Sequence, residues 1–85
     1  MAYSVELTKG AQRDLALLES DVAQRVMAAL EILRGTPRPY GCTKLEGEKG
    51  AYRMRVGTYR IKYHIDDTTR RVVVVKIQHR REVYR

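Results

Sequence analysis

The sequence predicts an α+β fold of the order βααβββ, in which a helical hairpin packs on one face of a mainly antiparallel four-stranded sheet. Three observations lead to this prediction: two adjacent stretches with helical apolar spacing, an alternating segment interrupted by a Gly-Thr pair, and a valine-rich segment near the C-terminus. With 85 residues the chain has room for one small core, so we expect residues 1–85 to form a single domain.

The first strand and the two helices come from the first 35 residues. Alternating apolar and polar side chains predict a short strand that ends at Thr8, which is also a suitable N-cap for a helix to about Leu18. Ser20 is the N-cap candidate of a second helix, whose apolar residues recur at helical spacing until Gly35. The two helices follow one another closely, so they should form a helical hairpin.

A loop and the last strand complete the expected order. Residues 35–50 contain two prolines followed by glycines and charges, which predicts a loop. After the alternating segment, residues 66–69 form a polar turn, and the β-branched run from Arg71 to Gln78 predicts a strand. This run is apolar for much of its length, which is typical of a strand with neighbours on both sides.

The alternating segment from Tyr52 to Tyr63 predicts a β-hairpin with two chemically opposite faces. Its Gly57-Thr58 loop has glycine in the first position, which suits a type II′ turn and places Val56 opposite Tyr59. One face is then apolar and packs against the helices. The other face is cationic and carries Arg53, Arg55, Arg60 and Lys62.

The predicted register sets like charges against each other on the cationic face. Arg55 faces Arg60 and Arg53 faces Lys62, an arrangement that costs on the order of half a kcal/mol for each pair. Local stability gives no reason for this arrangement, whereas a polyanionic ligand does. The alternative interpretation is an ordinary solvated sheet surface.

The charged residues are distributed unevenly along the chain. The formal net charge is +7; residues 1–43 hold five basic and five acidic side chains, and residues 44–85 hold twelve basic and five acidic. This asymmetry indicates a nucleic acid, an acidic membrane surface or an acidic protein as the partner. No basic, apolar N-terminal signal or membrane-length apolar run is present, so we expect a cytoplasmic protein.

The sequence predicts neither a disulfide nor a metal site. Cys42 is the one cysteine, it has no histidine nearby in the sequence, and we interpret it as inert filler. His64 and His79 do not have a spacing typical of metal ligands, so we expect no bound metal and no cofactor.

The residues after Gln78 bring candidate catalytic groups toward the cationic face. A tail leaving the last strand can lie beside that face, and it carries the imidazole of His79, the phenol of Tyr84 and further guanidinium groups. Cleavage of RNA by its own 2′-hydroxyl needs a base, charge stabilisation at the phosphate and a proton donor to the leaving oxygen. Arginine suits the second task because its planar fork binds phosphate bidentately.

Two motifs and the element order resemble the RelE/ParE toxin superfamily over essentially the whole chain. The motifs are the block from Leu45-Glu46-Gly47 through Tyr52-Arg53-Met54-Arg55-Val56-Gly57-Thr58-Tyr59-Arg60, and the ending His79-Arg80-Arg81-Glu82-Val83-Tyr84. The resemblance implies a RelE-like microbial ribonuclease fold and a toxin of a type II toxin–antitoxin system. It also implies a metal-independent endoribonuclease that cuts mRNA in the ribosomal A site and thereby inhibits translation.

The resemblance carries site roles over to five positions. It implies Arg55 and Arg60 as clamps on the scissile phosphate, Arg53 as an outer phosphate contact and Arg80 as stabiliser or donor at the leaving oxygen. Tyr84 is expected to stack on a base and is a candidate general base, which requires the surrounding arginines to favour the phenolate. The best-known relatives have lysines where this chain has Arg53 and Arg55, and arginine transfers protons less readily than lysine.

Further RNA or phosphate contacts are expected around these groups. His79 is the alternative base, and the role given to Arg80 could instead belong to Arg81. Lys62 completes the cationic face, and Lys44 and Lys49 are either RNA contacts or solvated loop charges.

The implied partners are the ribosome with its mRNA and a cognate RelB-like antitoxin, without any membrane. The toxin would be a monomer when free and part of a hetero-oligomer with the antitoxin. Two other functions stay open: a ParE-like toxin that inhibits DNA gyrase by binding it, and a non-catalytic nucleic-acid-binding module.

Overall fold

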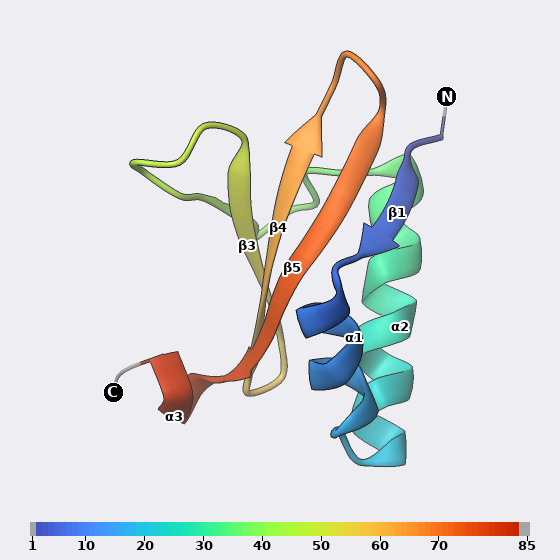
Figure 1. Cartoon of the computed structure of the whole chain (residues 1–85), viewed down its shortest axis with the longest axis vertical. Coiled ribbons are helices and arrows are strands. Elements are labelled where there is room, and N and C mark those ends of the chain that lie inside the picture. The colour runs from blue at the N-terminus through green and yellow to red at the C-terminus, as the bar shows by residue number, and fades with distance from the viewer. Residues whose placement is uncertain (1, 84–85) are drawn as a thin grey trace.

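In the computed structural model, which describes residues 2–83, five strands form one sheet in the order β1-β5-β4-β3-β2. The two long helices cover one face of this sheet (Figure 1). β1 runs parallel to β5, and the other neighbours are antiparallel. The strands are β1 (Ser4–Leu7), β2 (Thr43–Lys44), β3 (Ala51–Val56), β4 (Tyr59–Asp66) and β5 (Arg71–His79); the helices are α1 (Lys9–Ala16), α2 (Ser20–Gly35) and α3 (Arg80–Val83).

The predicted α+β fold and element order are confirmed, except that the sheet has a fifth strand and the chain a short last helix. β2 lies inside the predicted loop of residues 35–50, where Thr43 pairs with Arg53 and Lys44 with Tyr52. Two residues are too few to show the alternation that marks a strand in a sequence. β2 forms because the outer edge of β3 offers unpaired backbone groups.

The structure confirms one of the two predicted N-cap residues. The Thr8 hydroxyl accepts a hydrogen bond from the Ala11 backbone N–H at 3.2 Å, so its predicted N-cap role is confirmed. α1 ends two residues before the expected Leu18. Ser20 is wrong as an N-cap: it is the first residue of α2, and the extended residue before it is Glu19, which makes no side-chain capping bond.

The core lies between the helices and the sheet. α2 contributes Val26, Leu30 and Leu33, and the sheet contributes residues of β3, β4 and β5. Tyr63 is the largest fully buried side chain of this cluster, and its hydroxyl donates to the Pro37 carbonyl at 3.0 Å. Burial raises the pKa of the Tyr63 phenol, so it stays protonated and anchors the loop that follows α2.

An irregularity in β5 decides which side chains face the helices. Tyr63 pairs with Val74, whereas the preceding residue of β4 pairs two positions further along, so Val75 is an extra bulge residue. β1 ends beside Val74, and α1 takes its place along the rest of β5. There the Asp14 carboxylate accepts a hydrogen bond from the Ile77 N–H at 3.0 Å. The bulge shifts the alternation, so Ile77 reaches the core.

A polar network fastens the loop after α2 to the sheet. Arg38 binds both carboxylate oxygens of Asp67, at 3.2 and 2.8 Å, and donates to the Tyr52 hydroxyl at 3.0 Å. The Tyr3 hydroxyl donates to Asp67 at 2.6 Å. Hydrogen bonding from Arg38, with a smaller contribution from Tyr3, lowers the pKa of the Asp67 carboxyl. The network therefore joins the residue before β1, strand β3, the β4–β5 turn and the loop.

We expect acid to remove the contribution of this network to stability. The pKa of Asp67 is lower in the folded protein than in the unfolded chain, so the contribution is present above about pH 4 and is lost as the pH falls further. The Asp67→Asn variant should unfold at less urea than the parent at neutral pH, and the difference should shrink toward pH 2. A difference in unfolding free energy that does not change with pH would contradict this role.

We also expect Gly50 to be the glycine least tolerant of replacement. Its φ is +76°, and an added Cβ would lie 3.0 Å from the Ile65 carbonyl oxygen, beside the hydrogen bond from Ile65 N–H to the Gly50 carbonyl. Gly47 is the matched control, because its φ is +85° and nothing lies within 4 Å of the added Cβ. Gly47→Ala should cost about 1–2 kcal/mol of strain, and Gly50→Ala should cost more in urea unfolding. Equal losses would show that the Ile65 contact is easily relieved.

Candidate functional site

The predicted hairpin register is present in the structure. Val56 pairs with Tyr59, Arg55 with Arg60, and Arg53 lies opposite the remaining cation of the face. Gly57 has a φ of +60°, and Arg70 is the only non-glycine residue of the described chain with a positive φ. A positive φ at the first turn position alone is the type II′ geometry that the Gly57-Thr58 sequence predicts.

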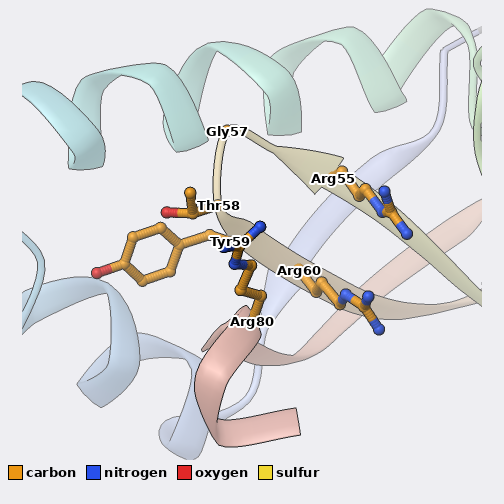
Figure 2. Close-up of a pocket in the computed structure, with 6 residues that line it drawn as sticks. All are labelled: Arg55, Gly57, Thr58, Tyr59, Arg60 and Arg80. Atoms are coloured by element: carbon orange, nitrogen blue, oxygen red, sulfur yellow. The ribbon is translucent and has the colours of Figure 1, made fainter. Parts of the chain in front are cut away.

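Three arginines from three different elements meet at this turn. Arg55 of β3, Arg60 of β4 and Arg80 of α3 line an open hollow of about 390 Å³ together with Gly57, Thr58 and Tyr59 (Figure 2). Figure 2 shows the Arg55 and Arg60 side chains extending to the same side of the hairpin, while the Arg80 side chain rises from the start of α3 toward the turn.

Backbone contacts hold Arg80 in place at the hollow. The Arg80 N–H donates to the Thr58 carbonyl at 2.8 Å, so the first residue of α3 is fixed to the tip of the hairpin. Arg60 is held differently, because its backbone belongs to β4, between β3 and β5, and only 9% of the residue is exposed. The arginines therefore reach the hollow from positions that the sheet and its connections determine.

Two of the arginines at the hollow have no carboxylate partner among the described residues. In the described part of the chain, no ion pair involves Arg55 or Arg80, although Arg34, Arg38 and Arg71 all contact carboxylates. Arg60 is a largely buried residue, and the attraction between opposite charges is stronger near a protein interior than in water. The hollow is thus a place where phosphate oxygens can be bound bidentately.

The far end of the cationic face is already neutralised by a carboxylate. The Lys62 ammonium lies 2.7 Å from one Glu48 oxygen, and the His64 Nε2 lies 3.5 Å from the other. Hydrogen bonding from Lys62 lowers the pKa of Glu48. Arg53 is half-buried opposite Lys62. The face therefore divides into a carboxylate-bound part and the hollow at the turn.

The structure does not bring Lys44 and Lys49 to the hollow. Both residues line a groove with Arg38 and Tyr52 at the opposite end of the hairpin. Lys44 pairs with Tyr52, five residues along β3 from the turn, a separation of about 17 Å at strand spacing. Any RNA contact from these lysines would be remote from the arginines at the turn.

Of the residues expected beside Arg80, His79 lies on the helix side of the sheet and not on the cationic face. His79 pairs with Tyr59 and lies edge-on to its ring, with centroids 5.1 Å apart and planes at 89°. Paired residues share a face of the sheet, so His79 is on the helix side, and its Nδ1 accepts from the Arg81 N–H at 3.2 Å. The Arg81 side chain is exposed. Tyr84 lies outside the described residues.

One cation near the turn was missed by the sequence analysis. Arg25 of α2 lies so close to Gly57 that a Cβ added there would be 3.6 and 3.7 Å from its two terminal nitrogens. Nothing in the local sequence distinguishes Arg25 from other exposed helical arginines. Its position becomes visible only when α2 is packed on the sheet.

Among residues 2–83, no three or more His, Cys, Asp and Glu side chains are grouped so that they could hold a metal ion. In the same part of the chain, no helix has the length and apolar character needed to cross a bilayer.

The chain matches known toxins in sequence and in structure. A family model described as the ParE toxin of the type II toxin–antitoxin system, parDE, matches residues 5–84. Toxin RelG of Mycobacterium tuberculosis is 35% identical over 86 residues, which cover 100% of this chain and 99% of the relative. The chain belongs to the RelE/ParE toxin superfamily.

Solved RelE structures have the same fold as this toxin. The toxin–antitoxin complex RelBE2 of M. tuberculosis contains a chain with a TM-score of 0.83 and 32% identity, covering 93% of this chain and 99% of that one. The archaeal RelE–RelB complex of Pyrococcus horikoshii gives a TM-score of 0.84 at 28% identity, covering 94% and 97%. The superfamily resemblance and the RelE-like fold predicted from the sequence are confirmed.

We expect Glu48 to weaken the binding of polyanions by this toxin. Glu48→Gln would release Lys62 and His64 from their carboxylate, so a single-stranded polyribonucleotide should bind severalfold more tightly in a fluorescence anisotropy titration at low salt. Glu46→Gln is the control, because it makes the same charge change in the same exposed loop. Equal effects of the two variants would show that only net charge matters.

Proposed function

We propose that this RelE-family toxin is an endoribonuclease that cuts mRNA in the ribosomal A site and so inhibits translation. The observation that carries the proposal is the meeting of Arg55, Arg60 and Arg80 at the Gly57-Thr58 turn. Three guanidinium groups from three elements around one hollow suit the pentavalent phosphate of a cleavage reaction. Similarity to RelE toxins supports the same reaction class.

In the proposed reaction, the 2′-hydroxyl oxygen of a nucleotide attacks its own 3′ phosphate. A new O–P bond forms, the bond from phosphorus to the 5′-oxygen of the next nucleotide breaks, and the products are a 2′,3′-cyclic phosphate and a 5′-hydroxyl. Arg55 and Arg60 would bind the non-bridging oxygens as negative charge develops on them. Arg80 would stabilise the leaving oxygen or donate a proton to it.

The proton transfer at the attacking hydroxyl is assigned to Tyr84, which would also stack on a base. This assignment rests on the family motif at the end of the chain. His79 is less suited to that part than the sequence indicates, because its ring packs against Tyr59 on the helix side of the sheet and its Nδ1 accepts a backbone hydrogen bond. A metal ion has no part in this reaction, because the arginines supply the positive charge.

The ribosome and its mRNA are the proposed substrate complex, and a RelB-like antitoxin is the proposed inhibitor. The solved relatives from M. tuberculosis and P. horikoshii are complexes with antitoxins, which supports a hetero-oligomer of this kind here. A net charge of +7 favours fast association with an acidic partner. The free toxin would be a cytoplasmic monomer.

A second candidate function is inhibition of DNA gyrase by binding. The family model that matches residues 5–84 is that of the ParE toxin, which favours this alternative. In that case the arginines at the turn would contact gyrase or DNA and would need no base. Nuclease activity is the better supported function, because a binding surface does not require guanidinium groups converging on one hollow.

Mapping of mRNA ends in a translation extract tests the proposal. The parent should produce new ends at A-site codons. Arg55→Ala, an exposed position, should lower the cleavage rate by about 10²–10³, as expected when one stabilising donor is removed from a transition state. Tyr84→Phe should also cut more slowly. Arg71→Ala should cut like the parent, because Arg71 pairs with Glu6 at the other end of β5.

Each contrary result has a defined meaning. Intact message combined with blocked supercoiling by gyrase would replace the nuclease with the gyrase inhibitor. Folded Arg55→Ala and Tyr84→Phe variants that cut as fast as the parent would show that the cleavage site lies elsewhere.

A further inference from the structure

The guanidinium of Arg25 lies beside the hairpin turn. Its two terminal nitrogens and central carbon would be 3.6, 3.7 and 3.9 Å from a Cβ built on Gly57. The two terminal nitrogens are therefore the part of the group nearest to the glycine. Arg25 comes from α2, so it approaches the turn from the helix side of the sheet, whereas Arg55 extends from the open side.

Arg25 is also a cation that the described residues do not neutralise. Arg25 is exposed, and within residues 2–83 its side chain takes part in no ion pair and no hydrogen bond. Arg34, on the same helix, lies 2.7 Å from a Glu31 oxygen. The turn therefore has an unneutralised guanidinium on each side, Arg25 on one and Arg55 on the other. A bound polyanion would neutralise both groups.

We propose that Arg25 forms a second phosphate subsite across the turn from Arg55 and Arg60. It would bind a phosphate beside the scissile one in a single-stranded RNA, and exposed Thr58, which lines the hollow, is the neighbour of Gly57 in the turn. Arg55 and Gly57 are two positions apart, about 7 Å along the strand, so an RNA strand that passes around the end of the hairpin would meet Arg55 on one side and Arg25 on the other. The inference deepens the proposed nuclease function and assigns Arg25 a binding role, not a catalytic one.

Phosphate binding by Arg25 would depend on both the positive charge and the planar shape of its side chain. A contact that only supported the turn would need the apolar stem of the side chain and not its charge. A phosphate contact needs the charge, and it gains from the planar fork that binds two oxygens at once. Substitutions that separate these properties therefore distinguish binding from support.

The test measures binding of a 2′-O-methyl RNA, which cannot be cleaved by this reaction, at several salt concentrations. Arg25→Gln keeps a polar stem on the turn and should weaken binding about tenfold at low salt. It should also reduce the slope of log affinity against log salt by about 0.7, the value for one lost phosphate contact to a single strand. Arg25→Lys should keep most of the slope but not all of the affinity.

Arg34→Gln is the matched control on the same helix. It removes the same charge nine residues away, about 14 Å along the helix axis, and should leave the salt slope near that of the parent. Thermal unfolding of each variant checks that the fold is retained. Equal changes in slope for Arg25→Gln and Arg34→Gln would overturn the subsite.

Comparison with the cleavage assay separates this inference from the proposed function. If the parent cuts mRNA and folded Arg25→Gln matches it in both cleavage rate and salt slope, the subsite is refuted and the nuclease stands. If the parent does not cut mRNA but Arg25→Gln lowers the slope, the phosphate subsite is supported and the nuclease proposal fails.

Discussion

The pairing of β3 with β4 is the constraint on which the rest of the structure depends. Because side chains alternate along a strand, the register at the Gly57-Thr58 turn decides that Met54 and Ile61 enter the core while Arg55 and Arg60 occupy the other face. A shift by one residue would turn arginines toward the helices and expose the apolar side chains. The same pairing thus supports the core and presents the site.

The site concentrates positive charge where the fold itself derives little benefit from it. Some cations outside the site contact carboxylates, as Arg38 contacts Asp67 and Lys62 contacts Glu48. At the turn, among described residues, Arg55 and Arg80 have no such pair and are held by the strand pairing and by a backbone hydrogen bond to Thr58. The pairing fixes the backbone positions from which these arginines extend, which reduces the reorganisation needed when a phosphate binds and so favours electrostatic stabilisation of a transition state.

Most of the candidate site followed from local patterns, and the exceptions have specific causes. Alternation and the glycine turn predict the Arg55–Arg60 pair, and Arg80 reaches it because β5 ends beside the turn. His79 departs from expectation because the bulge at Val75 reverses the alternation of the last strand residues. A bulge has no strong sequence signal in a run of valines, since every residue of the run suits either face.

The sequence by itself determined the α+β order, the hairpin register and the identity of two opposed arginines, because these depend on neighbours within a few residues. Tertiary structure alone decided the fifth strand, the bulge and the position of Arg25 against Gly57. These features arise from contacts between segments distant in the chain: β2 adds to a free edge, Asp14 satisfies the Ile77 N–H, and α2 brings Arg25 to the turn. Such contacts depend on how the helices pack on the sheet, which local periodicity does not specify.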